Sequence, residues 1–170
     1  MWMKILIPMA GEGSRFAKEG YTFPKPLIDV NGKPMIQTVV ENLDYDAEYI
    51  FLVRKEHLQT YDGLRSTLER ITDGNFQIVE VDQLTEGAAC TALLAKEHIN
   101  TDDDLLIANS DQFIEYSPHN FRTLKEMTDA DAIVYTFEAV HPKWSFVKTN
   151  SRGVITEVAE KNPISNIATC

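Results

Sequence analysis

The stretch that decides the fold is KILIPMAGEGSRF, residues 4–16. After one lysine it forms a short apolar run, which leads directly into a loop containing Gly11 and Gly13. A strand buried on both faces of a sheet has such a continuous run, whereas a half-exposed strand alternates between apolar and polar residues. We therefore expect a parallel strand over residues 4–9, with a glycine loop at its carboxyl end, where α/β proteins hold their ligands.

The rest of the chain alternates between apolar runs and amphipathic stretches. The expected strands cover residues 49–53, 77–81, 105–108 and 132–137, and the expected helices cover residues 34–43, 57–71, 86–98 and 119–127. Near the C-terminus, residues 146–149 and 154–158 flank a turn-forming centre, which predicts an antiparallel hairpin. The predicted fold class is α/β: three layers around a mostly parallel, Rossmann-like sheet, with a hairpin near the C-terminus.

The length of 170 residues and the lack of a linker-like segment predict a single domain over residues 1–170. The last four residues, Ile167 to Cys170, form an apolar, strand-like stretch without a terminating turn. We therefore expect that the domain is truncated at its C-terminus.

The composition excludes several classes of partner. A net charge of −10 is opposite to the basic field that nucleic-acid binding requires. No run approaches the roughly 20 apolar residues of a membrane span, and two cysteines, Cys90 and Cys170, cannot form a disulfide framework. We expect a cytoplasmic protein that contacts neither nucleic acid nor membrane, with a homo-oligomer left open.

A cation cluster follows the first strand. Backbone N–H groups in a glycine-rich loop can surround an anion, so Ala10, Gly11, Glu12, Gly13 and Ser14 are candidate nucleotide-binding residues. Arg15 adds a planar set of donors, and Lys25 is held between two prolines that restrict its backbone. The dinucleotide fingerprint is excluded because Phe16 replaces its third small residue, and the chain has no Gly-Lys-Ser/Thr tripeptide of the triphosphate-hydrolase loop.

Gly11 to Phe16, together with Pro24-Lys25-Pro26-Leu27, resembles the signature of the sugar-phosphate nucleotidyltransferases. Residues 83–89 are similar to the family's base-contacting segment, which implies that Gln83, Gly87 and Ala88 bind the nucleotide. Residues 109–112 are similar to the family's metal-binding turn, which implies that Asp111 holds Mg²⁺, although Asn109-Ser110 replaces the common Leu-Gly. Glu160 and Lys161 resemble its acceptor-binding pair, with Asn162 where a proline is frequent.

The resemblance implies an enzyme that transfers an NMP group from a nucleoside triphosphate to a sugar phosphate and releases pyrophosphate. Arg15 and Lys25 would be the catalytic residues, because the repulsion between two phosphorylated substrates has to be neutralised. Two alternatives stay open: a cytidylyltransferase for a non-sugar phosphate, and a non-catalytic nucleotide-binding domain. The second is favoured by the absence of a residue that matches the family's second metal-binding aspartate, which lies beyond this length.

Overall fold

The computed structural model describes residues 3–11, 24–115 and 117–169. Contacts divide the chain into two compact units, Met1–Pro118 and His119–Cys170. Within the described residues, no helix is both long and apolar enough to cross a lipid bilayer.

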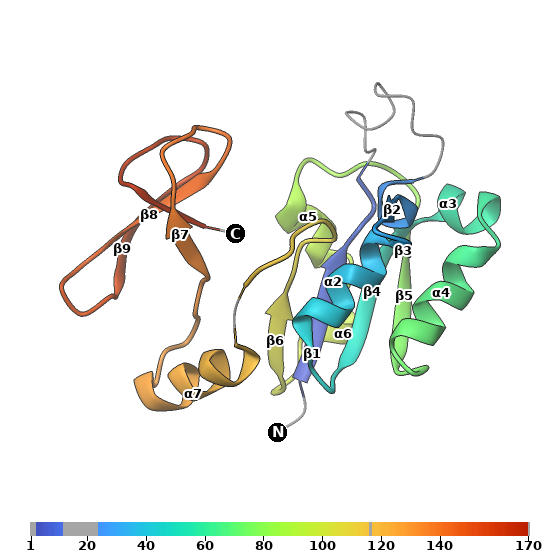
Figure 1. The fold of residues 1–170 in the computed structure, drawn as a ribbon, viewed down its shortest axis with the longest axis horizontal. Helices are drawn as coiled ribbons and strands as arrows, with labels where there is room; N and C mark the ends of the chain where they lie inside the picture. Colours follow the sequence, from blue (N-terminus) through green and yellow to red (C-terminus); the bar gives the residue numbers. More distant parts are fainter. Residues whose placement is uncertain (1–2, 12–23, 116, 170) are drawn as a thin grey trace. The chain divides into compact units, whose positions relative to one another are not determined.

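The first unit is built on a four-stranded parallel sheet with the order β5-β4-β1-β6. Its strands are β1 (Met3–Pro8), β4 (Glu48–Arg54), β5 (Phe76–Val81) and β6 (Asp104–Ile107). The apolar run of β1 is fully buried from Ile5 to Ile7, as expected for an inner strand with both faces covered. The predicted parallel sheet is thus confirmed, and the carboxyl ends of its strands lie at one edge (Figure 1).

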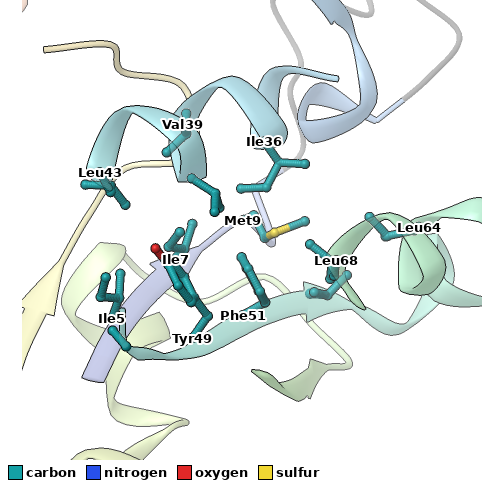
Figure 2. Close-up of a cluster of buried hydrophobic side chains, with 13 residues drawn as sticks. Ile5, Ile7, Met9, Ile36, Val39, Leu43, Tyr49, Phe51, Leu64 and Leu68 are labelled. Carbon is teal, nitrogen blue, oxygen red and sulfur yellow. The ribbon is translucent and has the colours of Figure 1, made fainter. Parts of the chain in front are cut away.

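Helices cover both faces of this sheet, which makes the three predicted layers. On one face, α2 (Met35–Leu43) and α4 (Gly63–Ile71) pack on the strands (Figure 2). That cluster contains Ile5, Ile7, Tyr49 and Phe51 of the strands with Ile36, Val39, Leu43, Leu64 and Leu68 of the two helices. On the other face, α5 (Ala88–Leu93) and α6 (Lys96–Ile99) contribute Ala92, Ala95 and Ile99 to a cluster around Leu6 and Ile50. Burying each large side chain contributes about 1.5–3 kcal/mol.

Two predicted helices are each divided in two, so the prediction of single helices was wrong. Residues 57–71 form α3 (Lys55–Thr60) and then α4, because Tyr61 has non-helical dihedral angles and Gly63, a poor interior helix residue, begins the new helix. Residues 86–98 form α5 and α6, with the break at Leu94 and Ala95. Ala95 is fully buried against the sheet, so tertiary packing overrides the helical propensity of this alanine-rich stretch.

Between β1 and α2 lies a short hairpin that the sequence analysis did not predict. The 3₁₀ helix η1 (Lys25–Leu27) leads into β2 (Asp29–Val30) and β3 (Lys33–Pro34). Asn31 and Gly32, the two residues between these strands, both have positive φ, as is typical of the two-residue loops of β-hairpins. The hairpin gives residues 25–34 a defined backbone path beside the amino end of α2.

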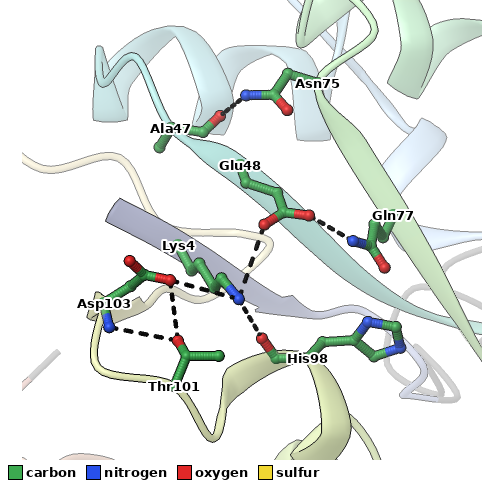
Figure 3. Close-up of polar contacts among 8 residues, drawn as sticks. All are labelled: Lys4, Ala47, Glu48, Asn75, Gln77, His98, Thr101 and Asp103. Carbon is green, nitrogen blue, oxygen red and sulfur yellow. Dashed lines mark hydrogen bonds and ion pairs between the residues drawn. The ribbon is translucent and has the colours of Figure 1, made fainter. Parts of the chain in front are cut away.

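A polar network joins the amino-terminal side of the sheet (Figure 3). The Lys4 ammonium of β1 donates to the His98 carbonyl at 2.7 Å and lies 3.6 Å from the Asp103 carboxylate and 3.9 Å from that of Glu48. These contacts tie β1 to β4, to α6 and to the segment before β6. They satisfy a lysine whose side chain is only 16% exposed.

The second unit contains α7 (Pro118–Thr128), which begins at the last residue of the first unit, and a four-stranded antiparallel sheet. The strands are β7 (Thr136–Glu138), β8 (Ser145–Thr149), β9 (Ile155–Ala159) and β10 (Ile167–Thr169), in the order β7-β10-β8-β9. The predicted hairpin is confirmed as β8 and β9. The predicted strand over residues 132–137 was wrong for residues 132–135, because β7 is limited to the three residues that pair with β10, and that pairing is antiparallel.

Candidate active site

A pocket of about 470 Å³ lies at the carboxyl edge of the parallel sheet. It is lined by the last residues of β1, β5 and β6, by the segments that follow these strands, and by α5. The lining residues are Pro8, Ala10, Gly11, Val81, Gln83, Leu84, Thr85, Gly87, Ala88, Ala89, Thr91, Ala92, Ile107 and Asn109. Most of these side chains are small or apolar, and a few polar groups lie among them, which is the usual composition of a small-molecule site.

The pocket brings together the predicted nucleotide-binding residues that the structure describes. Ala10 and Gly11 come from the loop after β1, whereas Gln83, Gly87 and Ala88 come from the segment between β5 and α5. More than 70 positions of sequence separate the two groups, and the parallel sheet places both at one edge. Glu12, Gly13, Ser14 and Arg15 lie outside the described residues.

Packing among the described residues requires a glycine neither at position 11 nor at position 87. A Cβ atom built on Gly11 or Gly87 would meet no atom of those residues within 4 Å. Their backbones also avoid the left-handed region, which is adopted by Gly32, Gly74 and Gly153. The presence of glycine at these two lining positions is therefore explained neither by backbone strain nor by a close protein neighbour.

The irregular segment before α5 is held by two threonine hydroxyl groups. The Gly87 carbonyl accepts a bond from the Thr91 backbone N–H at 3.0 Å. The Thr85 and Thr91 hydroxyl oxygens lie 3.1 and 3.2 Å from the same carbonyl, and they are within hydrogen-bond distance of each other. Sequence analysis missed both threonines, although a hydroxyl four residues after Gly87 on a helix is placed to bond to its carbonyl.

The Lys25 ammonium contacts the Asp111 carboxylate, although 86 residues separate them in sequence. Lys25 is the first residue of η1, and Asp111 lies in the turn after β6. The two side chains are 26% and 37% exposed, so this ion pair is partly shielded from water. In the same turn, Asn109 donates to the Gln112 side-chain oxygen at 2.8 Å and Ser110 is buried.

Asp111 is not part of a carboxylate cluster formed by described residues. Among the described residues, no group of three or more histidine, cysteine, aspartate or glutamate side chains could hold a metal ion. A magnesium ion is commonly bound by one or two carboxylates and completed by substrate oxygens and water. Asp111 fits that pattern as a single protein ligand, provided that a bound phosphate supplies further oxygens.

Glu160 and Lys161 belong to the second unit and directly follow β9. Their side chains pair with each other at 3.0 Å, and both are well exposed. Lys161 has a φ of +51°, which is uncommon for a residue other than glycine. Their role in acceptor binding stays a prediction.

Known proteins resemble this chain over nearly all of its length. The bifunctional protein GlmU of Methanocaldococcus jannaschii is 28% identical over 171 residues, which is 97% of this chain and 38% of that relative. A nucleoside-diphosphate-sugar pyrophosphorylase from Vibrio cholerae RC9 is 27% identical, with a TM-score of 0.73 over 97% of this chain and 70% of its own.

A UDP-glucose pyrophosphorylase crystallised with UDP-glucose has a TM-score of 0.79 at 20% identity, over 99% of this chain and 74% of its own, and this likeness concerns the fold alone. The chain thus spans well under half of the GlmU relative but more than two thirds of both solved structures. The family described as the MobA-like NTP transferase domain matches residues 5–168, a range that covers most of both units. The chain therefore belongs to the family of MobA-like NTP transferase domains.

Proposed function

We propose that this protein is a nucleotidyltransferase that transfers an NMP group from a nucleoside triphosphate to a sugar phosphate, giving an NDP-sugar and pyrophosphate. The observation that carries the proposal is the pocket at the carboxyl edge of the sheet, on which Ala10, Gly11, Gln83, Gly87 and Ala88 converge. Its family membership supports the transfer reaction. The name of a structure that is 27% identical to this chain, nucleoside-diphosphate-sugar pyrophosphorylase, supports a sugar phosphate as acceptor.

The pocket is suited to the nucleoside end of the triphosphate. Apolar groups such as Pro8, Val81 and Ile107 provide contact for the flat base, and the Gln83 amide offers both a donor and an acceptor for its edge. Gly11 and Gly87 leave room for the ligand to approach the backbone, which gives a reason for glycine where the fold supplies none.

The phosphate end would lie toward Lys25 and Asp111. Lys25 would contact the α-phosphate, with Arg15 assisting at the departing pyrophosphate, and the phosphate oxygen of the acceptor would attack without a protein nucleophile. Asp111 would hold a divalent cation, for which we propose Mg²⁺. When bound, that ion would supply Lewis-acid stabilisation of the charge that develops on the phosphates.

The acceptor side involves Glu160 and Lys161 in this proposal. The family match includes both compact units, which supports the hypothesis that residues 1–170 belong to one nucleotidyltransferase domain. We also propose that the protein acts in the cytoplasm.

The decisive test is the release of pyrophosphate in the presence of the four common nucleoside triphosphates and a panel of sugar phosphates. A matched set of glycine variants then tests the pocket. Gly11→Ala and Gly87→Ala should weaken triphosphate binding at least fivefold, because a methyl group that intrudes on a packed contact costs about 1–3 kcal/mol. Gly63→Ala is the control, since Gly63 also has open surroundings and ordinary dihedral angles but begins α4 outside the pocket lining.

Two results would contradict the proposal. The first is that all three glycine variants, Gly11→Ala, Gly87→Ala and Gly63→Ala, bind the triphosphate as tightly as the parent does. The nucleotide would then bind outside this pocket. The other is the absence of pyrophosphate release from a full-length protein with every triphosphate and sugar phosphate tested.

A further inference from the structure

We propose that Thr85 and Thr91 are positioning residues of the nucleotide pocket, and that their hydroxyl pair fixes the segment carrying Gln83 and Gly87 to the first turn of α5. This inference rests on the proposed function, since it assigns the pocket to a nucleoside triphosphate. It adds two residues that neither the glycine loop nor the cation cluster includes. Both threonines line the pocket.

The segment from Asp82 to Gly87 has no regular hydrogen-bonding pattern of its own. Such a segment can present Gln83 and Gly87 to a ligand in one geometry only if other groups hold it. The contacts at its end fulfil this role, because the Gly87 carbonyl lies 3.0 Å from the Thr91 backbone nitrogen and 3.1 and 3.2 Å from the two hydroxyl oxygens. The hydroxyl pair thereby connects positions on both sides of Gly87.

The number of protons defines what these hydroxyl groups can offer a ligand. Each hydroxyl has one proton and two acceptor lone pairs. Because the two oxygens are within hydrogen-bond distance of each other and both are near the Gly87 carbonyl, each hydroxyl proton has an acceptor inside the cluster. Both protons are thus used inside the cluster, so a ligand group that contacts Thr85 or Thr91 must be a donor, such as an N–H of the base or a ribose hydroxyl.

The cluster should act as a unit. Removing either hydroxyl breaks the shared arrangement, so the two single losses are expected to overlap rather than add. Thr85→Val and Thr91→Val keep the branched shape and remove only the hydroxyl group. Each should weaken triphosphate binding about three- to tenfold, the range expected for the loss of one ordinary hydrogen bond, and the double variant should lose no more than about tenfold.

The experiment measures triphosphate affinity by calorimetry for the parent and the variants at fixed salt and magnesium. Thr91→Ser and Thr85→Ser retain the hydroxyl group and should restore affinity to within about twofold of the parent. Thr128→Val is the matched control, because the Thr128 hydroxyl donates to the Leu124 carbonyl four residues earlier at 2.8 Å on an exposed helix of the second unit. It should leave triphosphate affinity within about twofold of the parent.

A second readout separates positioning from general stability. In a protein that turns over, the valine variants should raise KM for the triphosphate and leave kcat within about twofold, because base binding is equal in the ground state and the transition state. Hydrogen exchange of the backbone amides of residues 84–87 in the ligand-free protein should also be faster in the valine variants and unchanged in the serine variants.

The outcomes distinguish this inference from the function on which it rests. If the parent binds a triphosphate and both valine variants bind it equally well, the inference is refuted and the proposed function stands. If valine and serine variants lose affinity alike, the hydroxyl groups have no positioning role. If the parent binds none of the four triphosphates, the proposed function fails, and the inference fails with it.

Discussion

Replacing Lys25 with glutamine should change the affinity for a divalent cation and the affinity for a triphosphate in opposite directions. Lys25 and Asp111 contact each other in the absence of ligands. A cation that binds Asp111 therefore has to displace the Lys25 ammonium and tolerate its positive charge nearby. Lys25→Gln should tighten the binding of Mn²⁺, a spectroscopic substitute for Mg²⁺, to the ligand-free chain, and should weaken the binding of the triphosphate.

The structure sets the size of the first effect. A partly exposed ion pair, with side chains 26% and 37% exposed, contributes up to about 1 kcal/mol. A lysine near a divalent ion adds a screened repulsion of about 1 kcal/mol at physiological ionic strength. Removing both the ion pair and the repulsion should tighten Mn²⁺ binding by about 1–2 kcal/mol, or roughly five- to thirtyfold. In a full-length protein, the same substitution should lower kcat about 10²- to 10³-fold.

Electron paramagnetic resonance of free Mn²⁺ measures the first effect without nucleotide or turnover. Lys33→Gln is the matched control, because Lys33 also precedes α2 and pairs with a carboxylate, that of Glu41, at 2.6 Å. It removes the same charge but should leave Mn²⁺ affinity within about twofold of the parent. The reasoning is wrong if Lys25→Gln binds Mn²⁺ no more tightly than Lys33→Gln, or if the added Asp111→Asn substitution leaves the tightened binding intact.

Three other predictions concern the metal ligand, the length of the chain and pH. Asp111→Asn should keep the melting temperature close to that of the parent and remove the magnesium-dependent part of triphosphate binding, as measured by calorimetry. If binding depends equally on magnesium in both proteins, Asp111 is an ordinary turn residue. The 170-residue chain should bind a triphosphate but release pyrophosphate at least tenfold more slowly than a protein extended to the length of its relatives, and equal rates would show that residues 1–170 suffice for the reaction. Burial and the nearby Arg54 lower the pKa of His57, so the unfolded chain binds this proton more readily and stability should fall as pH drops below about 6.5. Thermal unfolding of His57→Gln should show a smaller loss of stability between pH 7 and pH 5 than the parent shows. An unchanged pH profile would exclude His57 as a source of this loss of stability.

The parallel sheet was predictable largely because its two inner strands, β1 and β4, are buried on both faces. Such strands are continuous apolar runs, and four of the five runs predicted for the parallel core became its four strands. The positions where helices break were harder to predict from the sequence, since they depend on how the chain packs on the sheet. Ala95, for example, is a strong helix former, but its burial against Leu6 and Ile50 requires a change of direction there.

The candidate site was predictable to the extent that it follows the ends of strands. Gly11, Gln83 and Asp111 come soon after β1, β5 and β6, and a parallel sheet places all three strand ends at one edge. The contact between Lys25 and Asp111 was not predictable, because it depends on the path of residues 24–34. A signal for part of that path was present in Asn31-Gly32, a typical two-residue hairpin turn flanked by Val30 and Lys33.

The ion pair between Lys25 and Asp111 has a consequence for how an acidic protein can hold a triphosphate. A net charge of −10 would repel that ligand, and an unpaired carboxylate beside the phosphate site would add to the repulsion. Lys25 compensates Asp111 while the site is empty of substrate, so neither charge is left alone in a partly buried turn. If Asp111 takes a cation that arrives with the triphosphate, Lys25 is released toward the phosphates at the same moment. Each charged side chain then exchanges one partner for another, which predicts that cation and triphosphate bind with positive cooperativity and that Lys25→Gln reduces this cooperativity.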